Sequence, residues 1–196
     1  MMSRTVRRAA LLGTASGIVI FLGYLLARKS GEPSTSTTVV PMRVALIGDS
    51  LAVGLAPHLQ KLVTQSDSGM LARFRYEAKA GTTVKQWVDN RWADWLEAYA
   101  PTLIIVVLGT NDLGYSPAPP RGPYEQFRDR LRATGARIVW VQPPIMPAHP
   151  MIGVRALIES LGVDVVPAAT VPLSSDGVHP SSYSGWAQQI WQAIRS

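Results

Sequence analysis

The sequence predicts a three-layer α/β/α sandwich around a mostly five-stranded parallel sheet, preceded by one N-terminal transmembrane helix. From Met42 onward, short runs of β-branched and aliphatic residues alternate with longer stretches of helical periodicity. This alternation is typical of βαβ units and a parallel sheet. The clearest run, Thr102–Leu108, is apolar at every position after its first residue. We therefore expect it to be a central strand that is covered on both faces.

Five segments have the length and composition of strands. They are Arg43–Ile47, Phe74–Ala78, Thr102–Leu108, Arg137–Val141 and Val163–Val166. The first of them ends at Gly48, as a buried strand that runs into a tight turn should.

Four segments are expected to be helices, and the alternation implies a fifth between the last two strands. The four are Leu51 to about Thr64, Thr83–Tyr99, about Tyr124–Ala133, and Ser182–Arg195. In the second, tryptophans and valines recur at three- and four-residue steps, which favours packing in the core over a ligand cage.

Composition limits the possible classes of protein. The chain has 196 residues, enough for one domain plus an appendage. Apolar residues make up 47% and charged residues 16%, which excludes intrinsic disorder of the whole chain. There is no cysteine, so disulfides, thiolate metal sites and a cysteine nucleophile are excluded.

The positive charge lies mostly at the N-terminus. Residues 1–40 contribute +4 of the formal net charge of +6. A nucleic-acid-binding domain would need a basic stripe on its folded surface. Arg128, Arg130 and Arg132, with Asp129 between them, are more typical of a solvated helix face. We expect no nucleic-acid partner.

Residues 1–30 are predicted to form a membrane anchor. Ala9–Ala27 is an uncharged 19-residue stretch, and a helix of that length spans about 28 Å, close to the thickness of the hydrocarbon core of a bilayer. A signal peptide has a shorter apolar core and a small-residue cleavage site. The one plausible site here, after Ala27, is followed directly by Arg28 and Lys29. A retained anchor is favoured, and secretion after signal cleavage is the alternative.

Residues 31–41 read GEPSTSTTVVP, a composition typical of a flexible linker. Residues 42–196 then form the predicted globular domain. Arginines before the span favour an N-terminus inside the cell and a domain outside the cytoplasm, either periplasmic or extracellular.

Polar residues follow the predicted strands, where parallel sheets form their binding sites. Gly48–Leu51 follows the first strand, Gly81–Thr83 the second and Gly109–Asp112 the third. Ser50 stands near a helix N-terminus, where it is either an N-cap or a reactive hydroxyl. Glycine N–H groups and the amide of Asn111 can stabilise an oxyanion, although both residue types are also common in turns.

A fourth polar segment, Asp176–Pro180, precedes the last helix. A carboxylate three residues before a histidine can fold back to its Nδ1–H, fix the tautomer and stabilise the imidazolium. Each of the four segments has an ordinary structural explanation alone. Their joint occurrence at one edge of the sheet is much more specific.

The four segments, in this order, resemble the conserved blocks of the SGNH hydrolase family, also called the GDSL esterase/lipase family. The matches are GDSL at Gly48–Leu51, a glycine at Gly81, GTND at Gly109–Asp112 and DGVHP at Asp176–Pro180. The resemblance covers about Arg43 to Arg195, and it implies the flavodoxin-like form of the sandwich.

The resemblance also implies roles for individual residues. Ser50 would be the nucleophile, His179 the general base and Asp176 the residue that orients His179. The backbone N–H groups of Ser50 and Gly81, together with the side chain of Asn111, would form the oxyanion hole. No cofactor and no metal are implied. The G-x-S-x-G motif of α/β-hydrolases is absent.

The implied function is a serine esterase that works through an acyl-enzyme. The family acts on acetylated sugars, lipid esters, lysophospholipids and thioesters. An outward-facing, tethered domain favours O-acetyl or other short acyl esters on carbohydrate at the cell envelope. The alternative is a lipid ester, lysophospholipid or thioester hydrolase at the membrane. A catalytically silent carbohydrate-binding module would be expected to lack Ser50, Asp176 or His179, and all three are present. The sequence indicates no oligomeric state.

Overall fold

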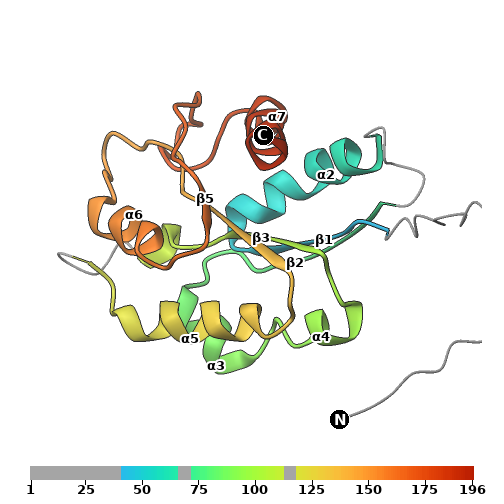
Figure 1. Cartoon of the computed structure of the whole chain (residues 1–196). Coiled ribbons are helices and arrows are strands. Elements are labelled where there is room, and N and C mark those ends of the chain that lie inside the picture. Colours follow the sequence, from blue (N-terminus) through green and yellow to red (C-terminus); the bar gives the residue numbers. More distant parts are fainter. Residues whose placement is uncertain (1–40, 66–71, 113–117) are drawn as a thin grey trace, which may run out of the picture. The chain divides into compact units, whose positions relative to one another are not determined.

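The computed structural model describes residues 41–65, 72–112 and 118–196. Its centre is a five-stranded sheet in the order β2-β1-β3-β4-β5, and all neighbouring strands are parallel (Figure 1). The strands are β1 (Arg43–Gly48), β2 (Arg73–Ala78), β3 (Leu103–Val107), β4 (Arg137–Val141) and β5 (Asp164–Val166). The parallel sheet predicted from the sequence is confirmed.

Helices cover both faces of the sheet. They are α2 (Ser50–Gln65), α3 (Val84–Asn90), α4 (Trp95–Tyr99), α5 (Arg121–Arg132), α6 (Ile152–Glu159) and α7 (Tyr183–Arg195). One face is covered by α2 and α7, and the other by α3 to α6 (Figure 1). The domain therefore has three layers, with the sheet between two layers of helices.

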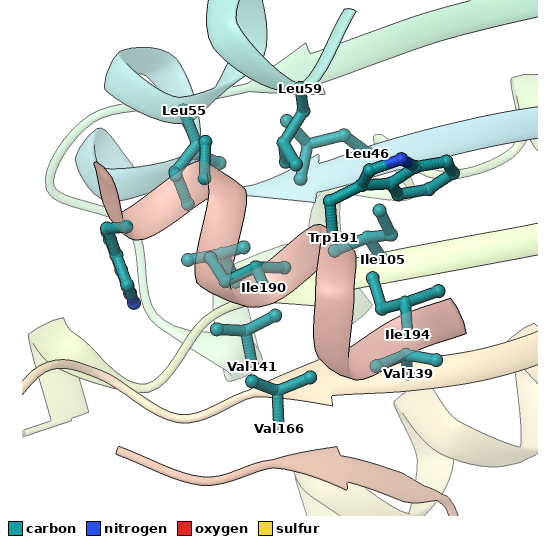
Figure 2. Close-up of a cluster of buried hydrophobic side chains, with 14 of the residues drawn as sticks. Leu46, Leu55, Leu59, Ile105, Val139, Val141, Val166, Ile190, Trp191 and Ile194 are labelled. Atoms are coloured by element: carbon teal, nitrogen blue, oxygen red, sulfur yellow. The ribbon is translucent and has the colours of Figure 1, made fainter. Parts of the chain in front are cut away.

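Each face of the sheet carries its own apolar cluster. Because side chains alternate along a strand, Val44 and Leu46 of β1 face α2 and α7, whereas Ala45 and Ile47 face the other layer. Figure 2 shows the first cluster, in which α7 lies over the sheet. Its labelled residues are Leu46, Leu55, Leu59, Ile105, Val139, Val141, Val166, Ile190, Trp191 and Ile194. Burial on both faces explains why the central strands are apolar throughout.

The single helix predicted for Thr83–Tyr99 is wrong. Two helices, α3 and α4, occupy this range. The first ends at Asn90, and the backbone of the next residue, Arg91, is left-handed with φ 56°. The apolar spacing continues across the break because both helices pack on the same core, where the rings of Trp87 and Trp92 meet edge to face at 5.6 Å. These tryptophans pack in or against the core, as the sequence predicted.

The bounds of another helix, α5, also differ clearly from those predicted. α5 begins at Arg121 rather than near Tyr124. Pro123 is tolerated there because the first N–H groups of a helix have no intrahelical partner. The implied helix between the last two strands is α6.

The predicted anchor, residues 1–30, and the linker up to residue 40 lie outside the described residues. Within the described part of the chain, no helix is both long enough and apolar enough to cross a membrane.

Gly48 allows the turn between β1 and α2 to pass close to β3. A Cβ atom at this position would lie 2.2 Å from the carbonyl oxygen of Val107 and 2.6 Å from the Cβ of Ala52. The next residue, Asp49, donates its backbone N–H to the same Val107 oxygen at 3.0 Å. The start of α2 is therefore fixed by a backbone contact that leaves no room for a side chain.

We expect Gly48→Ala to lower the free energy of unfolding by about 1–3 kcal/mol, the usual cost of overpacking a core. Urea unfolding of the full chain measures the change. Gly185→Ala is the matched control, because a Cβ at this exposed position of α7 meets no atom within 4 Å. It should raise the stability by about 0.5–1 kcal/mol. Equal stability of the two variants would contradict the packing argument.

Candidate active site

Ser50, His179 and Asp176 form one continuous hydrogen-bonded chain. The Oγ of Ser50 lies 2.8 Å from Nε2 of His179. The Nδ1 of the same ring lies 2.6 Å from Oδ2 of Asp176. Ser50 is the first residue of α2, and the other two lie in the segment between β5 and α7. The fold thus brings together residues from opposite ends of the domain sequence.

The segment around Asp176 holds its carboxylate by several hydrogen bonds. Oδ1 accepts the backbone N–H groups of His179 at 3.0 Å and Val178 at 2.9 Å, and the hydroxyl of Ser174 at 2.9 Å. These hydrogen bonds, with the one from the His179 side chain, hold the pKa of Asp176 well below its usual range. The carboxylate therefore stays charged beside the imidazole.

The hydroxyl of Ser50 is not the cap of α2. That role belongs to Asp49, whose Oδ1 accepts the backbone N–H of Leu51 at 3.0 Å. The side chain of Ser50 is left to bind His179. Ser50 also has an N–H at the first helical position, where no earlier turn supplies an acceptor and the helix dipole favours negative charge.

Asn111 and Gly81 lie on neighbouring strand ends. Asn111 belongs to a short 3₁₀ turn, Thr110–Asp112, after β3. Its Nδ2 donates to the carbonyl of Thr82 at 3.1 Å and lies 3.3 Å from Oδ2 of Asp49. Gly81 directly precedes Thr82 in an exposed turn, with φ 73°. The ends of β2, β1 and β3, which are adjacent in the sheet, therefore meet beside Ser50.

Hydrogen bonds to buried residues fix the turn that carries Gly81. The backbone N–H of Lys79 donates to the carbonyl of Gly48 at 2.9 Å, which ties the turn to the end of β1. The hydroxyl of Thr82 donates to the carbonyl of Lys79 at 2.7 Å and accepts the indole N–H of Trp87 at 2.9 Å. A buried tryptophan of α3 thus fixes the position of the turn.

Asp49 was assigned no role from the sequence, although the structure places it at the centre of the site. It is fully buried, and burial raises its pKa to about 7. The hydrogen bond from Leu51 opposes this shift, and the nearby charge of Asp112 adds to it. Its position directly after a buried strand was the one available signal. Burial of the side chain depends on distant elements and could not be read from its neighbours.

Asp112 is a buried positioning residue at the end of the 3₁₀ turn after β3. Its Oδ2 accepts the backbone N–H of Val84 at 3.3 Å and so joins the 3₁₀ turn to the start of α3. Burial raises its pKa, and hydrogen bonds from Val84 and the Tyr124 side chain oppose the shift.

No cluster of metal ligands is present among the described residues. They contain no group of three or more histidine and carboxylate side chains that could hold a metal ion. His58 lies half-buried on α2, and His149 is exposed in the loop after β4.

Such a hydrogen-bonded chain has a defined chemical capacity. A serine hydroxyl bonded to an imidazole can lose its proton as it attacks an electrophile, and a carboxylate on the far nitrogen stabilises the resulting imidazolium. N–H donors aimed at one point stabilise a developing oxyanion. The hydrogen bonds from Ser50 through His179 to Asp176 are suited to acyl transfer.

Solved structures share the fold at low sequence identity. The crystal structure of TesA has a TM-score of 0.63 and 22% identity, and the match covers 79% of this chain and 98% of that chain. An acetyl-xylooligosaccharide esterase mutant from Geobacillus stearothermophilus gives a TM-score of 0.63 at 16% identity, covering 78% and 94%. A carbohydrate esterase family 3 protein from Talaromyces cellulolyticus gives 0.60 at 21% identity, also covering 78% and 94%.

Among curated protein sequences, none matches this chain. The model of the GDSL-like lipase/acylhydrolase family matches residues 46–195, which include all four motif segments and nearly the whole domain. On this match the chain belongs to the GDSL-like lipase/acylhydrolase family.

Proposed function

We propose that the protein is a serine esterase in which Ser50 is the nucleophile, His179 the general base and Asp176 the residue that orients the base. The observation that carries the proposal is the unbroken chain of hydrogen bonds from Ser50 through His179 to Asp176. A silent binding module on the same fold has no need of this chain.

The reaction proceeds in two steps. As Oγ of Ser50 attacks the ester carbonyl carbon, its proton passes to Nε2 of His179. The oxyanion is stabilised by the N–H groups of Ser50 and Gly81 and by the amide of Asn111. His179 then protonates the leaving alcohol. In the second step His179 takes a proton from the water that attacks the acyl-enzyme, and it returns this proton to Oγ of Ser50 as the acid leaves.

Asn111 must free a hydrogen to serve in this oxyanion hole. Its Nδ2 carries two hydrogens, and in the free enzyme it contacts both Thr82 and Asp49. The contact with the Asp49 carboxylate, at 3.3 Å, is longer than the 3.1 Å bond to the Thr82 carbonyl. The longer contact is the one that yields when substrate binds, while Thr82 keeps the amide in place.

The proposed substrates are O-acetyl or other short acyl esters on carbohydrate at the cell envelope. The predicted anchor within residues 1–30 supports a membrane-tethered, extracytoplasmic domain. Two structural neighbours are described as an acetyl-xylooligosaccharide esterase and a carbohydrate esterase. The second candidate is an ester or thioester of a membrane lipid, because an anchored enzyme would stay close to such substrates.

A panel of esters tests both the reaction and the substrate class. With the full chain, kcat/KM should be highest for p-nitrophenyl acetate and fall for butyrate and octanoate, and acetylated xylan should release acetate. Ser50→Ala should lower the rate by about 1,000-fold or more, because the nucleophile is lost. Ser184→Ala removes an exposed hydroxyl on α7 and should leave the rate unchanged.

Two results would contradict this proposal separately. A Ser50→Ala variant that keeps more than a few per cent of the parent rate would refute the nucleophile. Preference for octanoate, or for a lysophospholipid over acetylated xylan, would replace the carbohydrate ester by the lipid ester.

Asp176→Asn should lower kcat by about 10⁴-fold with little change in KM, because the amide neither holds the imidazolium nor fixes the right tautomer. Steady-state kinetics with p-nitrophenyl acetate measure the split. Asp164→Asn, which removes an exposed carboxylate on β5, is the control and should leave both constants unchanged. A variant at position 176 with nearly the parent kcat would show that this aspartate only shapes the turn.

Asp49 gives the folded protein a pH-dependent stability. Its pKa is about 7 in the folded protein and about 3.9 in an unfolded chain. Between these values the folded state binds more protons than the unfolded state. Its contribution is therefore fully present below about pH 4 and is lost as the pH rises toward 7, at up to about 1.4 kcal/mol per pH unit.

Asp49→Asn removes this titration. We expect the difference in unfolding free energy between the variant and the parent to shift in favour of the variant between pH 5 and pH 8, as measured by urea unfolding. Asp89→Asn, at an exposed position of α3, should show no comparable shift. A difference that does not vary with pH would show that the buried carboxyl does not titrate in this range.

A further inference from the structure

The edge of the domain opposite the candidate site carries a cluster of arginines. Arg43 and Arg73 face each other in register at the N-terminal ends of β1 and β2, and Arg75 follows two residues later on the same face of β2. The guanidinium of Arg75 lies over the ring of Trp95, 4.4 Å from its centroid. We call the surface formed by these four residues and Tyr99 the α4 basic patch.

Contacts with α4 hold the patch together. The Nε of Arg43 donates to the carbonyl of Ala100 at the end of α4, and the hydroxyl of Tyr99 donates to the carbonyl of Val44. Burial raises the pKa of Tyr99, and the charges of the three arginines act in the opposite direction. All three cations therefore lie within electrostatic reach of one aromatic residue.

The charge of the patch is not neutralised by the domain. Within the described residues, none of its three arginines forms an ion pair, and neither does Glu97, the acidic residue of α4. Four other surface arginines each contact a carboxylate, namely Arg91, Arg121, Arg128 and Arg137, whereas the exposed Arg132 and Arg195 stand outside any such cluster. An exposed cluster of unpaired guanidinium groups beside two aromatic rings fits an anionic surface.

The position of the patch indicates which surface that is. The chain enters the domain at Met42, directly before Arg43, and the predicted membrane span ends at Ala27, with the predicted linker 31–41 between them. The patch is thus at the point where a membrane anchor would join the domain. Ser50, the first residue of α2, follows the other end of β1, about 20 Å away for six residues of strand.

We propose that the α4 basic patch docks on anionic phospholipid headgroups and holds the catalytic end of the domain away from the bilayer. One guanidinium group can bind two phosphate oxygens at once, and tryptophan and tyrosine favour the headgroup region of a bilayer. The part of this inference that concerns the substrate rests on the proposed function. A docked domain presents Ser50 to polymeric esters of the envelope, and lipid esters in the same bilayer lie out of reach.

Site-specific labelling of the full chain tests the docking. The protein has no cysteine, so Ala98→Cys and Ala148→Cys each provide one thiol for an environment-sensitive fluorophore. Both alanines are exposed, one on α4 in the patch and the other in the loop after β4. The labelled chains are reconstituted in nanodiscs of phosphatidylcholine, with or without phosphatidylglycerol, and quenched with neutral acrylamide.

Phosphatidylglycerol should reduce quenching of the label at position 98 by about twofold and leave that at position 148 unchanged. Arg73→Gln combined with Arg75→Gln should abolish the protection. Lys61→Gln combined with Lys85→Gln, which removes the same charge elsewhere, should preserve it. Neither pair touches the candidate site, so hydrolysis of p-nitrophenyl acetate should be unchanged.

Several outcomes would overturn the docking. They are equal quenching at position 98 in both lipids, protection at position 148 instead, protection by an acidic polysaccharide in phosphatidylcholine discs, and failure of the full chain to remain with the discs. The fluorescence readout does not depend on catalysis. An inactive enzyme that still shows lipid-dependent protection would refute the proposed function alone, and an active enzyme without protection would refute the docking alone.

Discussion

The hydrogen bond from the backbone of Leu51 to the buried carboxyl of Asp49 is the contact on which the site depends. It caps α2, so the helix needs no cap from Ser50, and the hydroxyl of that serine is left for His179. The other carboxyl oxygen of Asp49 contacts Asn111 and so links the ends of β1 and β3. Desolvation of a carboxyl group opposes folding, and this burial is tolerated because Leu51 and Asn111 supply hydrogen-bond donors.

Much of the fold could be predicted because its signals are local. A strand buried on both faces is an uninterrupted apolar run, and the predicted bounds of Arg137–Val141 agree with β4. The break at Arg91 could not be predicted, because the two helices on either side of it keep one apolar spacing against a common core. The segment Ile152–Glu159 is short and follows a proline-rich loop, so its helical pattern was too brief to assign.

The candidate site likewise has a part that could be predicted from the sequence and a part that could not. The order of the motifs along the chain indicated Ser50, Asn111, Asp176 and His179, since parallel strands place their carboxyl ends at one edge. The contact between Asp49 and Asn111 could not be foreseen, because it joins residues that are 62 positions apart in sequence. Full burial of this carboxyl arises only when the ends of β1, β2 and β3 meet. Asp49 and Asp176 therefore differ in pKa because of long-range packing, which a single sequence does not display.

These two carboxyl groups have opposite electrostatic environments. Asp176 is half-exposed and accepts hydrogen bonds from two backbone N–H groups, so its pKa is lowered and it remains an anion. Asp49 is fully buried, so its pKa rises to about 7 and its charge is disfavoured. In the proposed mechanism His179 gains a proton during the reaction, and one fixed anion on the far side of its ring would stabilise the imidazolium. A full charge on Asp49, which contacts Asn111, would repel the oxyanion that the proposed mechanism places beside this amide. In the proposed mechanism, the opposite pKa shifts of these two carboxyl groups would thus support the imidazolium and the oxyanion together.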